Sequence, residues 1–179
     1  MHIPGLGEVA PDAVFPELWL RSDPVPVPVL GGRPCRFIVE GYDGDRAPED
    51  FHAAVRTFLA LDHAVLEAAI PHLWAYYRDI TDDVLAAGDD DWYVEIAGPE
   101  RVLDHIRLGD VPVVTRDHHA DRHVYVSVEC ACDWEEEHGL QLVFRDGAEV
   151  TKVGPYDGHV TNAGAYGDPS LQGVVYRVK

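Results

Sequence analysis

Carboxylates, imidazoles and an amide gather in one stretch of this chain, between Tyr125 and Asp168. The candidate site residues within it are Trp134, Glu135, Glu136, Glu137, His138, Tyr156, Asp157, His159 and Asn162. Imidazole and carboxylate groups are ligands for zinc and other divalent metals, and a metal with an open coordination position can activate water. The same groups, placed on turns, can also reach a protein partner, so the residue types alone leave both chemistries open.

The strands that must position these groups are predicted by hydrophobic alternation. Residues 123–132 place Val124, Val126 and Val128 on one face, and strands are also predicted at residues 140–145 and 148–153. Asp146-Gly147 between the last two runs is a strong signal for a two-residue hairpin. With these two as central turn residues, Arg145 is expected to pair with Ala148, and Leu140 with Val153.

This meander brings two polar segments to the same end of a sheet. The first strand leads into a predicted turn at Glu135–His138, and the third leads into the Asp157-Gly158-His159 loop. Because neighbouring strands lie about 4.8 Å apart, side chains some twenty positions apart in sequence can then share a small site. His138, Asp157 and His159 are the candidate metal ligands, with a glutamate of 135–137 as general base.

Each of these residues also has a structural interpretation, which the sequence leaves open. Asp157-Gly158 is typical of a turn, His159 and Asn162 can bond loop backbone, and Trp134 can cover the sheet. The sequence contains no zinc-protease, phosphate-loop, nucleophile-elbow or dinucleotide motif. A ligand site, a protein-contact surface and a well-tied loop therefore remain as alternatives.

The cysteines and the remaining polar clusters are expected to be structural. Cys130 and Cys132 could supply two thiolates to zinc, but both continue the valine row and are predicted to be buried. The histidine-rich segment 118–123 is expected to be a hydrophilic loop, and Asp89–Asp91 a solvated turn, although either could hold a cation.

The charge of the chain excludes one class of partner. With 14 Lys and Arg against 32 Asp and Glu, the formal net charge is −18, and such a field repels nucleic-acid phosphates. The acidic surface suits a basic protein partner, a cation or simply solubility. No signal peptide or membrane-length apolar run is present, and three cysteines do not suggest a disulfide framework, so a cytoplasmic location is expected.

We expect one α+β domain over residues 1–179. Residues 1–46 are predicted to form short strands, with the VPVPV segment as an edge strand or an extended connector because proline lacks a backbone donor. Residues 48–86 are predicted to form an inserted helical hairpin that starts at Pro48, with its second helix kinked or divided at Pro71. Residues 92–179 are expected to add a strand at 92–96, a short helix from Pro99, the C-terminal meander and a last strand at 171–178, giving a mainly antiparallel sheet.

The segment CDWEEEHGLQLVFRDG, followed by VGPYDGHVTNA, resembles a family of uncharacterised bacterial proteins. Their C-terminal domain carries W-x-x-E-H-G-L-x-x-x-F and then D-G-H-x-T-N, a likeness that covers Val124 to Asp168. The resemblance implies no established activity. In size and charge the chain is also similar to immunity partners of secreted toxins.

Two functional hypotheses follow. The first is a non-enzymatic cytoplasmic protein-binding module with an acidic surface. The second is a divalent-metal-dependent hydrolase with its site at the Glu135–His138 and Asp157–His159 turns.

Overall fold

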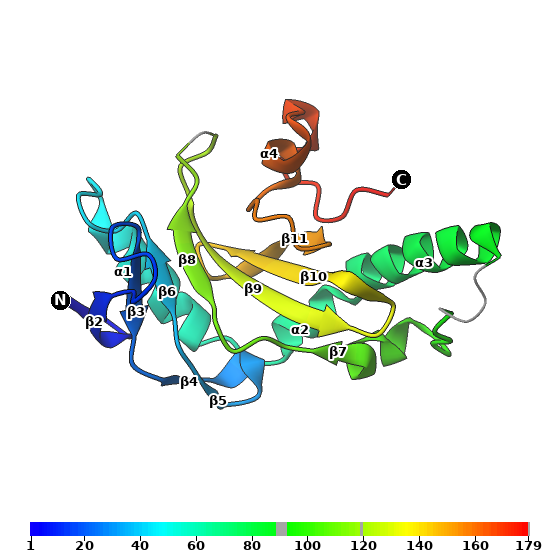
Figure 1. Cartoon of the computed structure of the whole chain (residues 1–179), viewed down its shortest axis with the longest axis horizontal. Helices are drawn as coiled ribbons and strands as arrows, with labels where there is room; N and C mark the ends of the chain where they lie inside the picture. Colours follow the sequence, from blue (N-terminus) through cyan, green and yellow to red (C-terminus); the bar gives the residue numbers. More distant parts are fainter. Residues whose placement is uncertain (89–92, 119, 179) are drawn as a thin grey trace.

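The computed structural model describes residues 1–88, 93–118 and 120–178 (Figure 1). It has the predicted α+β architecture, in which one large and mainly antiparallel sheet carries helices on one side. The strands of the large sheet, in spatial order, are β1 (His2–Ile3), β2 (Gly7–Pro11), β3 (Trp19–Ser22), β6 (Ile38–Glu40), β8 (Val113–Arg116), β9 (Val124–Cys132), β10 (Glu135–Arg145) and β11 (Glu149–Gly154), with β7 (Ile106–Arg107) also pairing with β9.

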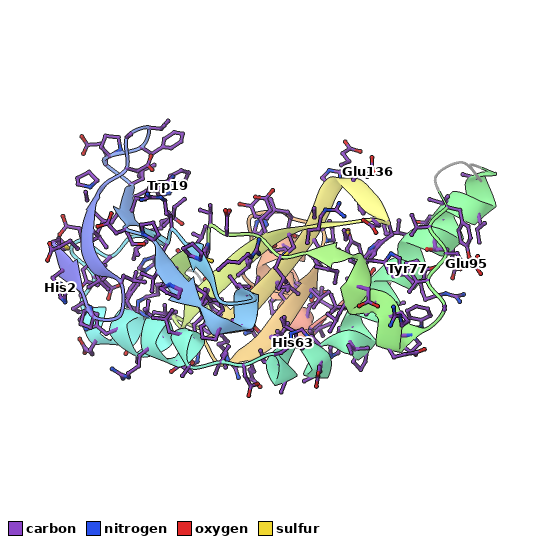
Figure 2. All side chains as sticks on the ribbon, turned by 90° about the horizontal axis from the view of Figure 1, so that it is seen from below. His2, Trp19, His63, Tyr77, Glu95 and Glu136 are labelled. Carbon is purple, nitrogen blue, oxygen red and sulfur yellow. The ribbon has the colours of Figure 1, made fainter. Side chains whose placement is uncertain are left out.

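Only β6 and β8 pair in parallel, among the strand pairs of the described residues. The chain between them crosses over through the predicted helical insertion, as parallel neighbours require. Helix α1 (Pro48–Leu59) begins at the expected proline, and Pro71 marks the predicted division between α2 (Ala64–Ala68) and α3 (Ile70–Ala87). Helix α1 packs on β8 and β9, and α2 and α3 pack on β11, so all three cover one face (Figure 2).

The buried face of the sheet contains the predicted valine row. Val124, Val126 and Val128 are fully buried, and Cys130 and Cys132 continue the row at 3% and 1% exposure. Burial raises the pKa of both thiols to about 12. A thiolate is therefore strongly disfavoured at either position, as expected for cysteines that pack as small hydrophobic side chains.

The three thiols are expected to resist a thiol-specific reagent in the native protein. Cys35, Cys130 and Cys132 are all free and buried, and only the thiolate reacts. At pH 8, fewer than about 0.1 thiols per chain should react with Ellman's reagent within minutes, and all three should react in guanidinium. Fast native labelling of even one of them would contradict the burial described here.

Residues 1–46 contain short strands, as predicted, and strand pairing shows where the VPVPV segment lies. The VPVPV segment forms β4 (Val25–Val27), which pairs only with β5 (Arg33–Cys35) in a separate small sheet, and then η1 (Pro28–Leu30). Pro26 faces Pro34 across this pair. Two residues without backbone donors thus sit outside the main sheet, as proline requires.

The first hairpin of the C-terminal meander differs from the prediction. Its turn is at Asp133–Trp134, so Glu135 already belongs to β10 and pairs with Cys132. The register then shifts before Leu140, which pairs with Cys130, leaving Glu136–Gly139 as a bulge. The expected turn at Glu135–His138 was wrong because a bulge and a turn carry the same polar, glycine-containing signature.

The second hairpin has the predicted turn but not the predicted register. Asp146 and Gly147 have φ of 50° and 67°, and the Ala148 N–H donates to the Arg145 carbonyl at 2.9 Å. In the ladder, however, Arg145 pairs with Glu149, and a second bulge after Val143 brings Leu142 opposite Val153. At Leu142 the slip relative to the expected Leu140–Val153 pair is two residues, so Val153 keeps its predicted face. At Arg145 the slip is one residue, so Val150 takes the place opposite Phe144 that was predicted for Glu149.

Two further strand predictions are corrected, whereas the short helix predicted from Pro99 is present. Residues 93–96 are irregular, not a strand, and Trp92 lies outside the described residues. The helix from Pro99 is the 3₁₀ helix η3 (Pro99–His105). Instead of a strand at 171–178, the chain forms α4 (Asn162–Tyr166), η4 (Pro169–Leu171) and an irregular tail, in which the Val175 carbonyl accepts from Val153 N–H at 2.7 Å.

No helix among the described residues is both long enough and apolar enough to cross a membrane.

Candidate functional site

A cleft of about 600 Å³ lies on the sheet face opposite the helices. Figure 2 shows Trp19 and Glu136, two of its lining residues, on the upper side of the sheet, with His63 and helices α1 and α2 on the lower side. We call this feature the acidic cleft. Its floor contains Ile38, Val113, Thr115, Ser127 and Gln141, its walls contain Trp19, Val111, Tyr156, Gly158 and Val160, and its carboxylates are Glu40, Asp110, Glu129, Glu136 and Glu137.

Negative charge dominates the acidic cleft. The lining formed by the described residues includes five carboxylates and the His138 imidazole, but no lysine or arginine. The pKa of Tyr156 is raised, first by burial and then by the negative charges of Glu129, Asp157 and Glu40. Since low-dielectric walls focus such a field, the cleft attracts cations and repels anions.

The rim at β10 is built by the bulge, with Glu135 as its internal support. The Glu135 carboxylate is 16% exposed and accepts from the backbone N–H groups of Glu137 (2.8 Å) and His138 (3.1 Å). It also lies 3.2 Å from His138 Nδ1. Gly139 closes the bulge at a φ of 60°, a conformation that favours glycine. Glu136 and Glu137 are thereby left exposed at the cleft.

The opposite wall is held by a buried cation, Lys152 of β11. Its side chain is 1% exposed, and its Nζ donates to Gln141 Oε1 at 2.6 Å, Asp157 Oδ1 at 2.6 Å and the His159 carbonyl at 3.1 Å. Burial lowers the pKa of Lys152, and Asp157 opposes that shift. We call this arrangement the Lys152 clamp. It fastens residues 156–160, and with them Tyr156 and Val160, to the sheet.

Two buried polar side chains lie in the cleft floor beside this clamp. Gln141 (1% exposed) donates through Nε2 to Ser127 Oγ (6% exposed) at 2.9 Å. The Ser127 hydroxyl thus accepts from an amide and is not paired with an imidazole among the described residues. The floor therefore has no serine–histidine pair of the kind that activates a nucleophile.

The two polar segments converge at one end of the sheet, as the sequence predicted. The Tyr156 N–H donates to the His138 carbonyl at 3.1 Å, which joins the Asp157–His159 loop to the β10 bulge. Of the candidate residues, Glu136, Glu137, His138 and Tyr156 line the acidic cleft. Glu135 and Asp157 do not line the cleft, but their carboxylates hold the bulge and the loop in shape through backbone hydrogen bonds.

The other candidates have structural positions. Trp134 is 6% exposed and packs edge-on against Tyr76 and Tyr77, 6.0 and 5.8 Å between ring centroids, so it belongs to the core and is not available at the surface. Asn162 is 5% exposed and donates to the carbonyls of Val174 and Val175, which holds the C-terminal tail.

The predicted metal ligands are not assembled. No group of three or more His, Cys, Asp or Glu side chains among the described residues is arranged to hold a metal ion. Asp157 instead accepts from the Lys152 ammonium and the His159 N–H, while His159 Nδ1 lies 3.1 Å from the Asp157 carbonyl. The Lys152 ammonium is thus bound to the Asp157 carboxylate, which was expected to bind zinc.

The minor polar clusters do not join this site. His123 Nδ1 pairs with Asp146 at 2.7 Å, and Arg116 forms a buried ion pair with Asp45 at 2.8 Å. His119 and Asp89–Asp91 lie outside the described residues.

Sequence reasoning missed much of the acidic cleft because its residues come from distant strands. Trp19, Glu40, Asp110 and Glu129 are separated by long stretches of chain, and only the pairing of β3, β6, β8 and β9 brings them together. The alternation does contain one signal, since it places Ser127 and Glu129 on the face opposite the valines.

Comparison with known families supports one assignment. The profile of the domain of unknown function DUF6985 matches residues 5–160. The chain belongs to this family. The DUF6985 match spans every residue that lines the acidic cleft and ends before α4 and the C-terminal tail. No curated protein and no solved structure matches the chain.

Proposed function

We propose that this protein is a non-enzymatic cytoplasmic binding module whose acidic cleft receives a positively charged segment of a protein partner. The observation that carries the proposal is the lining itself: Glu40, Asp110, Glu129, Glu136 and Glu137 surround one cleft in which the described residues place no lysine or arginine. Charge complementarity of this kind steers association and selects against wrong partners. It also argues against nucleic acid, whose phosphates the same field repels.

The apolar part of the cleft supports a protein as the partner. Ile38 and Val113 lie in the floor, and Trp19 and Tyr156 lie in the walls. Binding energy at protein interfaces is concentrated in aromatic side chains within a polar rim, and this cleft has that composition. A volume of about 600 Å³ accommodates a few side chains, not a folded domain. The proposed occupant is thus a protruding loop or an extended segment that presents lysine or arginine.

An immunity-type role is one form of this proposal, in which the acidic cleft blocks a basic surface of a toxin. The large negative charge supports it. The cytoplasmic location is proposed with it, and the free and buried state of the three cysteines supports a reducing compartment.

The proposal predicts that Glu136→Lys weakens binding of a basic probe. A fluorescein-labelled peptide of alternating lysine and glycine, titrated at low salt and followed by anisotropy, should bind the native protein. The substitution removes one rim charge and adds an opposite one, so the Kd should rise about tenfold, equal to about 1.4 kcal/mol. Raising the salt should weaken native binding too, since exposed charges are screened.

Glu67→Lys is the matched control, because Glu67 is exposed on α2, on the other side of the sheet, and the change in net charge is identical. Its Kd should stay within about twofold of the native value. Equal weakening by both substitutions would show that only total charge matters and that the acidic cleft is not the site.

A further inference from the structure

An exposed apolar loop lies next to the acidic cleft. Residues 13–18, here called the apolar loop, precede β3 and include Val14, Phe15 and Leu18, which are 72%, 46% and 59% exposed. Single exposed hydrophobic residues are common, but three within five positions form a patch. Such patches on soluble proteins mark sites of interaction.

The apolar loop is held in a fixed shape. Asp12, 4% exposed, accepts from the N–H groups of Val14 (2.8 Å) and Phe15 (3.0 Å) and pairs with Arg21 at 2.7 Å. The N–H groups of Leu18 and Trp19 both donate to the Phe15 carbonyl. The exposed side chains are thus displayed by a hydrogen-bonded turn, so a partner that packs on them orders little additional chain.

Trp19 joins the apolar loop to the acidic cleft. Its ring packs edge-on against Phe15, with centroids 4.5 Å apart, and the same residue lines the cleft wall. Figure 2 shows Trp19 on the upper side of the sheet, the side that also carries Glu136. Apolar loop and acidic cleft are therefore continuous through one aromatic side chain.

We propose that the apolar loop and the acidic cleft form a single docking surface for a partner segment that carries an apolar residue next to a run of lysine or arginine. This proposal rests on the proposed function and extends it. The apolar side chain packs on Val14 and Leu18, and the basic side chains enter the cleft past Trp19. Arrangements in which apolar anchors flank a charged rim are typical of specific protein interfaces.

The charges around the apolar loop favour such a partner over other occupants. Glu17 is exposed within the loop and Glu40 lies on the adjacent β6, whereas the nearby Arg21 is already paired with Asp12. An anionic membrane surface is repelled by this field. A second copy of a chain with a net charge of −18 is repelled as well.

The test compares three labelled peptides by fluorescence anisotropy. One is the lysine–glycine peptide used above, and the others add Trp-Leu at its N-terminus or its C-terminus. At least one extended peptide should bind the native protein ten times more tightly than the plain peptide. In the variant Val14→Ser with Leu18→Ser this gain should fall below twofold, while binding of the plain peptide stays unchanged.

Leu85→Ser is the control, because Leu85 is 48% exposed on α3 and should leave the tenfold gain intact. Both loop side chains in the double variant are largely exposed, so its melting temperature should match that of the native protein. The inference is overturned if neither extension tightens binding, or if the gain survives in the double variant.

Failure of the proposed function gives a different pattern, in which the plain peptide does not bind or its binding is insensitive to Glu136→Lys. Two additional measurements examine other occupants. A native dimer that the double variant dissociates in sedimentation, or native binding to phosphatidylcholine vesicles that the double variant loses, would overturn the inference in favour of self-association or a lipid surface.

Discussion

Lys152→Met is expected to lower the free energy of unfolding by about 3 kcal/mol, because it breaks a buried ion pair from one side. The substitution keeps the length of the side chain but leaves Gln141 Oε1 and Asp157 Oδ1 without the donor that now lies 2.6 Å from each. Gln141 is 1% exposed, so its oxygen has little access to water, whereas the Asp157 side chain, at 33% exposure, regains part of its hydration. The expected loss of about 3 kcal/mol is therefore at the lower end of the range for a buried ion pair that loses one partner.

The expected decrease is measurable by thermal unfolding. For a chain of this size, 3 kcal/mol corresponds to a fall in Tm of roughly 6–12 °C. Arg145→Met on the neighbouring strand is the matched control, since it also removes a long cation, but from an exposed pair with Glu149 (37% and 64% exposed). That change should cost less than about 1 kcal/mol. Equal Tm values for the two variants would show that the Lys152 clamp contributes no more than a surface pair.

The same substitution should also alter the acidic cleft. Without Lys152, residues 156–160 lose two of the bonds that tie them to the sheet, at Asp157 and at the His159 carbonyl. Amide hydrogen exchange in this segment should become faster than in the Arg145→Met control, because local opening no longer breaks a buried pair. Since Tyr156 and Val160 belong to the wall, a looser segment also predicts weaker binding of the basic peptide.

The faces of the strands were predictable from sequence because their side chains alternate with a period of two. The row from Val124 to Cys132 is buried as expected, and Val153 stays on its predicted face despite the register error after Asp146-Gly147. Helix α1 was equally clear, since a proline start and a spaced apolar face agree. Strand faces and helix α1 both depend on the spacing of apolar residues close together in the sequence, and that spacing is regular here.

Pairing between distant strands was not predictable in the same way. The bulge at Glu136–Gly139 and a turn share the same local residue types, and only the partner strand shows which of the two forms. Lys152 stands in a strand on the face opposite Val153, where a lysine ordinarily contacts water. The loop that contains Asp157 covers Lys152 and buries it. Nothing in the sequence around Lys152 predicts this burial.

The same limit explains why zinc was a plausible hypothesis for His138, Asp157 and His159. The meander correctly brings together the two segments that carry them, but the three side chains do not form a ligand set among the described residues. The charge of the space between strands depends on every side chain that enters it. Lys152 supplies a positive charge where a metal was expected. Residue spacing can therefore suggest a set of metal ligands. Whether those ligands are free to bind a metal depends on other residues, which spacing does not identify.

Gly109→Ala is expected to destabilise the protein by about 3 kcal/mol or more, because added volume in a packed site that cannot yield forces the backbone to move. A Cβ at this position would overlap the backbone carbonyl oxygen of Glu129 in β9. Backbone cannot rotate away as a side chain can. The connector between β7 and β8 would have to lift from the sheet, and with it Asp110 and Val111, which line the acidic cleft.

Gly158→Ala separates this steric effect from the general cost of replacing a glycine in the cleft. Gly158 has a φ of 77°, and a Cβ there would meet nothing within 4 Å, so only backbone strain of about 1 kcal/mol is expected. Urea unfolding of both variants should therefore give a difference of about 2 kcal/mol. If both variants lose the same stability, the connector between β7 and β8 can move at no free-energy cost. Its close contact with β9 would then not fix the cleft wall. If Gly109→Ala alone is strongly destabilised, the cleft has a rigid wall on the connector side, as selective recognition of a basic segment requires.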